Sequence, residues 1–294
     1  MNVTVHQRPG VYSAYDASSV VSGSGAGKQV GLVAVNAKAA ANEVKIVTSY
    51  DGAVNAFGQG TMAELVRLAL KNGAGAVAAV PIAGGEGYAD GFAALEGLED
   101  ITAVICDSTD GDVQKAMKQS VETASANRRE RIAVAAGGAG ETVDQLIARA
   151  KALNHERVVL VAPGGVNQNG EAADGLGVAA AVAGAIAGES DPAVPLGGAV
   201  LTGLYGLSGR YSDGEMDRLI LGGVTPVESL AGTVGVVRGV TTRTTTGEAA
   251  DATWRDLTTI RIVDDVIPTL RRALRTKFQR PKNTAQSRSA IRAQ

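Results

Sequence analysis

The sequence predicts an α/β fold: a mostly parallel sheet with helices on both faces, plus an extended N-terminal arm and a basic C-terminal helix. Short, continuous apolar runs alternate with amphipathic stretches between about residues 30 and 163. Strand starts near residues 101, 131 and 157 are about one βαβ unit apart. Apolar residues make up 45% of the 294 residues but aromatic residues only 3%, so small aliphatic side chains must form the core.

The apolar runs predict five strands. The runs lack the polar alternation of a strand with one face in solvent, and continuous runs are typical of strands covered on both faces. The expected strands are residues 30–35, 76–80, 101–106, 131–135 and 157–162. Helices connecting successive parallel strands would then cover both faces of the sheet.

Three of the connecting helices have recognisable start signals. Thr61 and Glu64 have the spacing of a capping box, and Thr142 and Gln145 repeat it. Asp112 can cap the helix that lies between them in the chain. Apolar residues recur at helical spacing in each stretch, so each helix has one face for the core.

The two ends of the chain depart from this pattern. Residues 1–28 combine an Arg-Pro-Gly turn with a Ser- and Gly-rich stretch that lacks helical periodicity, and we interpret them as an extended arm with a flexible link. Residues 29–280 are expected to form the α/β core. Residues 281–294 are polar, and we interpret them as the start of a C-terminal arm region.

A basic helix is expected from Asp264 to Lys277. Acids in its first turn and bases in its last are the arrangement that the helix dipole favours. The apolar stripe expected to dock on the core consists of Val266, Ile267, Leu270 and Leu274. The bases expected to face outward are Arg271, Arg272, Arg275 and Lys277.

Composition restricts the classes of function. A formal net charge of −2, with few aromatic residues among the C-terminal bases, argues against nucleic-acid binding. The single cysteine, Cys106, excludes an internal disulfide and a cysteine-based zinc site. No apolar run approaches the roughly 18 residues of a membrane span, and the N-terminus lacks a signal-peptide pattern. The sequence therefore predicts a protein made in the cytoplasm, without membrane insertion.

Glycine-rich stretches give two incomplete nucleotide-site signals. Residues 22–29, SGSGAGKQ, resemble a phosphate-binding loop, but Gln29 stands where a magnesium ligand is needed and the loop leads into a strand. Residues 137–140, GGAG, lie between a strand and a helix but lack the G-x-G-x-x-G spacing. A flexible link and a tight turn explain these glycines more simply.

Reactive side chains are also poorly grouped for catalysis. Asp107 follows a strand at the position where open α/β sheets hold reactive groups, but nearby Asp110 and Asp112 are explained by a turn and a helix cap. Neither histidine can be placed in a Ser-His-Asp site, so we expect no cofactor and no metal. The alternative that stays open is a nucleotide- or small-molecule-binding enzyme of Rossmann- or flavodoxin-like architecture, with its ligand near Asp107, Gly137 and Gly164.

Four motifs in order along the chain carry a family resemblance. They are RPGVY at residues 8–12, VTSY at 47–50, GGVTPVE at 222–228, and GTVGVVRGVTTRTTTGEAADATWRDL at 232–257. This succession resembles the sheath proteins of contractile phage tails and phage-tail-like bacteriocins. Similar sheath chains continue past about residue 283 into a C-terminal domain, so the resemblance implies that residues 281–294 begin an arm region that is truncated here.

The resemblance implies a structural protomer rather than an enzyme. Such protomers polymerise into a helical stack of hexameric rings around an inner tail tube protein, meet baseplate and tail terminator proteins at the ends, and contract to drive the tube through a cell envelope. The particle is a virion tail, a bacteriocin or another contractile injection system, assembled in the cytoplasm of the bacterial host.

The resemblance also suggests two contact sites. The N-terminal arm, recognisable by Arg8, Pro9, Gly10, Val11 and Tyr12, would add a strand to the sheet edge of a neighbouring subunit. The bases of the C-terminal helix would face the inner tube. These bases are Arg271, Arg272, Arg275 and Lys277.

Overall fold

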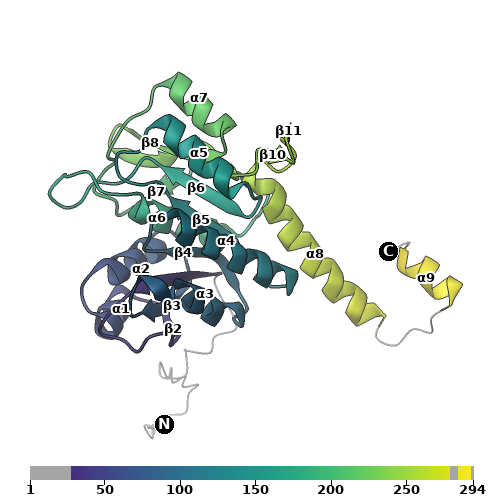
Figure 1. The fold of residues 1–294 in the computed structure, drawn as a ribbon. Helices are drawn as coiled ribbons and strands as arrows, with labels where there is room; N and C mark the ends of the chain where they lie inside the picture. The colour runs from purple at the N-terminus through teal and green to yellow at the C-terminus, as the bar shows by residue number, and fades with distance from the viewer. Residues whose placement is uncertain (1–27, 279–283, 293–294) are drawn as a thin grey trace, which may run out of the picture.

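The computed structural model describes residues 28–278 and 284–292. Its centre is a nine-stranded sheet in the order β2-β3-β1-β4-β5-β6-β8-β9-β7, and helices cover both faces (Figure 1). A long helix then leaves this body and extends away from it (Figure 1). The predicted α/β fold class, a mostly parallel sheet with helices on both faces, is confirmed.

Six adjacent strands form the parallel part of the sheet. In spatial order they are β3 (Ala76–Ile82), β1 (Gln29–Val35), β4 (Ile101–Cys106), β5 (Ile132–Ala136), β6 (Val158–Ala162) and β8 (Val224–Leu230). Strands β3, β5 and β6 are buried along their whole length, as continuous apolar runs predict. All five expected strands are present, with bounds that differ by at most two residues.

One of these differences concerns Arg131. The fourth expected strand, β5, begins at Ile132 rather than at Arg131, and the buried side chain of Arg131 turns toward the end of a neighbouring helix. Its guanidinium donates hydrogen bonds to the carbonyl oxygens of Leu95 and Leu98, at 3.0 and 2.9 Å. Burial lowers the pKa of Arg131 to about 10.

Antiparallel strands, which the sequence analysis missed, close both edges of the sheet. At one edge β2 (Lys45–Val47) pairs with β3. At the other edge β9 (Thr233–Val236) pairs with β8, and the two-residue β7 (Val200–Leu201) pairs with β9. A separate hairpin is formed by β10 (Thr245–Thr246) and β11 (Ala249–Ala250).

Two groups of helices cover the two faces of the sheet. One face carries α1 (Tyr50–Phe57), α2 (Thr61–Lys71) and α6 (Leu176–Gly188), and the other carries α3 (Tyr88–Glu96), α4 (Gly111–Ala126), α5 (Val143–Leu153) and α7 (Asp213–Leu221). Helices α2 and α6 pack almost backbone to backbone. A Cβ atom on Gly184 would lie 2.3 Å from the carbonyl oxygen of Ala69, so glycine is required there.

The helix starts agree only partly with the sequence. Thr142 and Gln145 form the expected capping box of α5. The box expected at Thr61 is wrong, because Gly60 is the N-cap of α2 and the Glu64 carboxylate binds Arg67 instead. The cap of α4 is Asp110 rather than Asp112; its side chain accepts hydrogen bonds from the backbone N–H groups of Asp112 and Val113.

The C-terminal helix also begins earlier than expected. Helix α8 runs over Leu257–Lys277 with Asp256 at its N-cap, so Asp264 and Asp265 lie inside the helix rather than at its start. A short helix, α9 (Ala285–Arg292), follows it. Among the described residues, no helix has both the length and the apolar character needed to cross a bilayer.

Candidate functional site

The point where the strand order reverses is the usual place of a ligand site in an open α/β sheet. Strand β1 lies between β3 and β4, and open α/β sheets bind ligands at the carboxyl ends of such strands. Asp107 lies at this position. One of its carboxylate oxygens accepts a hydrogen bond from the Val35 N–H at 2.9 Å, and the other accepts one from the Tyr88 hydroxyl at 2.7 Å. Asp107 therefore ties β1, α3 and β4 together.

The glycine turn after β5 is occupied by the protein's own carboxylate. The Glu141 side chain accepts a hydrogen bond from the Gly138 N–H at 2.9 Å, where a phosphate group would be expected in a nucleotide-binding turn. Arg149 binds the same carboxylate and also donates to the carbonyl oxygen of Thr109. Burial alone would raise the pKa of Glu141, but the hydrogen bonds from Arg149 and Gly138 outweigh it and lower the pKa below its ordinary value.

The remaining space at these strand ends is small. A cavity of about 150 Å³ is lined by Gly137, Gly164 and Tyr211 among others, whereas small-molecule pockets usually start near 300 Å³. Gly164 serves packing, since a Cβ atom on it would lie 2.2 Å from the carbonyl oxygen of Ala173. The three residues expected to line a ligand site, Asp107, Gly137 and Gly164, thus lie at the same end of the sheet but hold the fold together.

The surroundings of two further candidate reactive residues, Cys106 and His155, indicate structural roles. Cys106 is buried, and burial raises the pKa of its thiol to about 12, so the reactive thiolate is scarce. His155 lies 3.1 Å from the Glu122 carboxylate and accepts a hydrogen bond from the Arg157 N–H. Within residues 28–278 and 284–292, no three His, Cys, Asp or Glu side chains are grouped as metal ligands would be.

Helix α8 is anchored to the body at its start. Leu257 and Ile260 belong to the core, and buried Arg261 donates to the carbonyl oxygens of Ile186 and Glu189 at the end of α6. One turn later, Asp264 forms a bidentate ion pair with Arg157 at 2.6 and 2.8 Å. These contacts explain why Asp264 lies within the helix.

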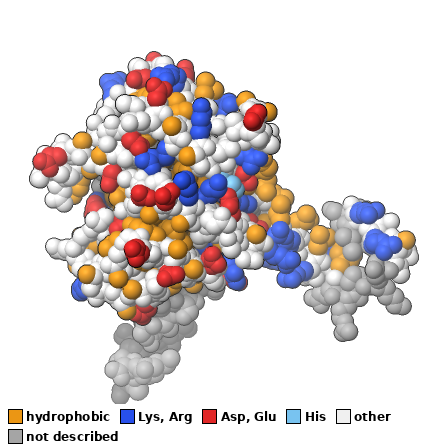
Figure 2. Space-filling view, viewed as in Figure 1, with side chains coloured by type: hydrophobic (Ala, Val, Ile, Leu, Met, Phe, Trp, Pro, Cys, Tyr) orange, Lys and Arg blue, Asp and Glu red, His pale blue; other side chains and the backbone are white. Residues whose placement is uncertain are grey.

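Beyond this anchor, the apolar stripe of α8 points away from the body, opposite to the expectation. Val266, Ile267 and Leu270 are exposed by 52%, 39% and 49%, and Ile262 by 40%. Figure 2 shows apolar side chains along the outer side of the helix and basic side chains toward the body. The stripe cannot dock on the core because the helix diverges from the body after its first two turns, and the docking expectation is wrong.

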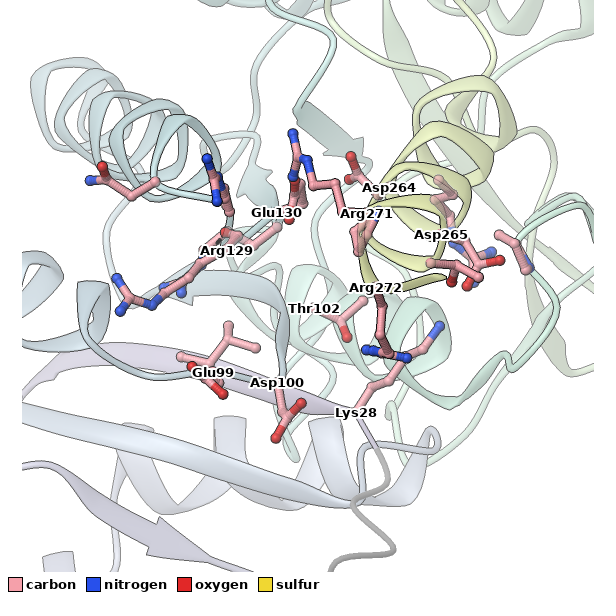
Figure 3. A pocket seen from close by; sticks show the side chains of 18 of the residues that line it. Lys28, Glu99, Asp100, Thr102, Arg129, Glu130, Asp264, Asp265, Arg271 and Arg272 are labelled. Carbon is pink, nitrogen blue, oxygen red and sulfur yellow. Dashed lines mark hydrogen bonds and ion pairs between the residues drawn. The ribbon is translucent and has the colours of Figure 1, made fainter. Parts of the chain in front are cut away.

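The bases of α8 instead line a groove between the helix and the body (Figure 3). The groove has a volume of about 1140 Å³. Arg271 donates to the Glu130 carboxylate of its own body at 2.9 Å, while Arg272 and Arg275 line the groove with exposed side chains. Lys277 is exposed near the end of the helix.

The expected arm lies outside the described residues, so Arg8, Pro9, Gly10, Val11 and Tyr12 have no place in this structure. The same holds for most of the SGSGAGKQ stretch. The chain enters the described part at Lys28, and Lys28 lines the groove beside α8.

Comparison with known proteins identifies the class of this architecture. Residues 82–242, more than half of the chain, match the family model of the phage tail sheath protein central domain. The chain belongs to the phage tail sheath protein family, and this match favours a structural sheath protein over the nucleotide-binding enzyme that the sequence left open. A search of curated protein sequences found no match.

Several solved structures that share the fold are of sheath proteins or sheath complexes. The crystal structure of a sheath tail protein from Desulfitobacterium hafniense is 14% identical, with a TM-score of 0.72 over 97% of this chain and 86% of that chain. The helical sheath of the anti-feeding prophage in its contracted state is 18% identical, with a TM-score of 0.68 over 98% and 82%. The sheath of the extracellular contractile injection system PVC is 19% identical, with a TM-score of 0.64 over 96% and 78%.

Proposed function

We propose that this protein is the sheath protomer of a contractile tail or injection machine, without catalysis of its own. Copies polymerise into a helical stack of hexameric rings around an inner tube protein, and the stack contracts to drive the tube through a cell envelope. The observation that carries the proposal is the sheath family match across residues 82–242. The strand ends support it, because Asp107 and Glu141 are already bound within the fold.

Electron microscopy of the purified full chain, alone and with its tube protein, tests this proposal. Tubes or stacked rings are expected, and a ring whose lumen accepts the tube protein would support the inner partner. A discrete monomer or dimer at every concentration, together with stoichiometric binding of a small molecule, would contradict it. The particle would be made in the bacterial cytoplasm and end in baseplate and terminator proteins, whether it is a virion tail or a bacteriocin.

We also propose that residues 1–28 link neighbouring subunits, residues 29–280 form the body with α8, and residues 281–294 begin a second arm. An extended arm can add a strand to a neighbour's sheet edge and still pivot at a flexible link. Deletion of residues 1–12 should then abolish tube formation with little change in melting temperature. A collapse of thermal stability on deletion would show that the segment belongs to its own domain.

For the inner tube, we propose contact through Arg272, Arg275 and Lys277, with Arg271 shared with Glu130 of the body. Ionic contacts at exposed positions are individually weak, roughly 0–1 kcal/mol, so a contracting sheath can break many of them together. High salt should weaken assembly on the tube, because at about 1 M the Debye length is near 3 Å. Reversing Arg272 and Arg275 to glutamate should uncouple the sheath from the tube. Extended sheath at wild-type yield with this variant would contradict the contact.

A further inference from the structure

The chain carries its opposite charges in different places. Eight of its 28 lysines and arginines follow Asp265, and none of its 30 acidic residues does. Residues 1–265 therefore have a formal charge of −10 and residues 266–294 one of +8. Such a division attracts the C-terminal segment of one copy to the acidic body of another.

The outward face of α8 has the geometry of a contact surface. Val263, Ile267, Leu270 and Leu274 follow one another at steps of four, three and four residues, the spacing of a seam between packed helices or between a helix and a flat surface. Val263 packs against the core, so the exposed stripe continues a buried one. Within this stripe, Ile267 and Leu270 are exposed, while Val263 packs against the core and Leu274 lines the groove beside the body.

A helical stack of identical copies requires contacts between two different patches, since a patch that binds itself closes a dimer. The second patch is a bare sheet face at the end of β8. Val200, Gly235 and Glu228 are direct cross-strand neighbours and so point to the same face, and Leu230 follows Glu228 by two residues. We call these four residues the bare sheet face.

This face is exposed because its covering helix is short. Helix α7 buries Val224 at the start of β8 but leaves the end of the strand in solvent. Val200 and Leu230 are exposed by 56% and 54%. Gly235 has no side chain and lies between Val200 and Glu228, which leaves a notch about one side chain wide. Glu228 forms no ion pair with any described residue, so a negative charge stands at the rim.

We infer that the outward face of α8 docks on the bare sheet face of a second copy of this chain. Leu270, at the middle of the stripe, enters the notch over Gly235, and Glu228 faces the basic end of the helix. The inference rests on the proposed function as a self-assembling sheath and names a contact between its subunits. An apolar contact suits a subunit interface that persists through contraction, whereas the ionic groove suits a tube contact that must break.

Disulfide trapping tests the contact directly. The full chain would be made as two single variants, Leu270→Cys and Val200→Cys. The native Cys106 is buried and should not form a disulfide. Mild oxidation of the mixture should give a covalent dimer at least tenfold above either variant alone. A dimer of Leu270→Cys with itself would overturn the inference in favour of a helix-to-helix contact. An uncrosslinked mixture would overturn it whether or not tubes form.

Filling the notch gives a second test that leaves α8 unchanged. A Cβ atom on Gly235 would meet only the carbonyl oxygen of Ala199 at 3.5 Å, so Gly235→Val should fold. It should reduce self-assembly at least tenfold at an unchanged melting temperature. The matched control is Gly214→Val on α7, where a Cβ atom meets nothing within 4 Å and assembly should be kept. Equal assembly of both variants would contradict the docking.

If the wild type forms neither tubes nor rings, the proposed function fails, and the trapping result still decides the contact. Tubes without a disulfide between the cysteines introduced at positions 270 and 200 would instead support the proposed function and overturn the contact.

Discussion

The carboxyl ends of the strands and helix α8 differ in one respect. At the strand ends, contacts within the chain bind the polar groups, whereas on α8 the chain leaves apolar side chains exposed. At the strand ends, Asp107 and Glu141 are bound by backbone N–H groups and neighbouring side chains. On the outer half of α8, large apolar side chains remain about half exposed. An α/β fold usually places its function in the cleft at the strand ends. Here the unsatisfied surface lies on the helix, which indicates a protein that works by contact with other chains.

The largest expected effect is at the anchor of α8. Replacing Asp264 with alanine leaves the Arg157 guanidinium, which is mostly buried, without its partner. Breaking a fully buried pair costs roughly 3–5 kcal/mol, and this pair, whose side chains are 13% and 16% exposed, should lie near the lower end of that range. The measurement is chemical denaturation of wild type and variant. Arg238→Ala, which breaks the half-exposed pair with Asp256, is the matched control and should cost less than about 1 kcal/mol. Similar losses in both variants would show that α8 is not held by the buried pair.

A smaller effect is expected at the glycine turn. Glu141→Gln removes the charge that Arg149 and the Gly138 N–H bind, with an expected loss of about 2 kcal/mol near neutral pH. The folded-state pKa of Glu141 lies below its ordinary value. Its stabilising contribution is therefore complete above the unfolded-state pKa of about 4.3 and is lost as the pH falls through the folded-state value.

Denaturation of the wild type and the Glu141→Gln variant between neutral and acid pH checks this sign. The difference in unfolding free energy between the two proteins should narrow as the solution becomes more acidic than about pH 4. A difference that widened in acid would mean that the carboxyl is protonated in the folded protein and that its ion pair with Arg149 is misassigned.

Substitutions on the outer half of α8 should hardly change the stability of the protein. Leu270→Ser replaces a side chain that is 49% exposed, and the unfolding free energy should change by less than about 0.5 kcal/mol. Assembly should nevertheless fall, because the contact surface is altered. Ile260→Ala on the same helix is the buried comparison and should cost about 2–5 kcal/mol. A large stability loss in Leu270→Ser would place that residue in the core.

The smallest expected effect is that of added nucleotides. A ligand at 100 times its dissociation constant stabilises a folded protein by about 2.7 kcal/mol. ATP, NAD and flavin mononucleotide should leave the melting temperature of the full chain unchanged, because Glu141 fills the turn that a phosphate would need. A saturable shift that disappears on changing Gly138 would restore the enzyme alternative.

Sequence periodicity predicted the parallel sheet well because its strands are buried on both faces and therefore read as continuous apolar runs. It missed the sixth parallel strand, β8, whose last residues are exposed. It also missed β2, β7 and β9, which are short, lie at or next to the sheet edges and, in β2 and β7, contain exposed residues such as Ile46 and Val200. The Thr142 capping box was predictable because both of its residues are local in the chain. The cap of α2 was not, since Thr61 and Glu64 have the right spacing but the Glu64 carboxylate finds Arg67.

The orientation of α8 could not be read from its sequence. An amphipathic pattern shows that a helix has one apolar face but not whether that face meets its own core or another chain. The place of Asp264 inside the helix and the direction of Arg271 depend on Arg157 and Glu130, which are 107 and 141 residues away from them in the chain. The binding of Glu141 in the glycine turn could not be predicted either, because glycines between a strand and a helix give the same sequence signal whether the turn binds a ligand or a side chain of the protein.

Hydrogen–deuterium exchange of the full chain, before and after assembly, tests the central claim that α8 rather than the strand ends is the working surface. Backbone amides of residues 262–274 should become protected on assembly, while the turn at residues 137–141 keeps the protection that it has in the free protein. Unchanged exchange along α8, or new protection confined to residues 137–141, would contradict the claim.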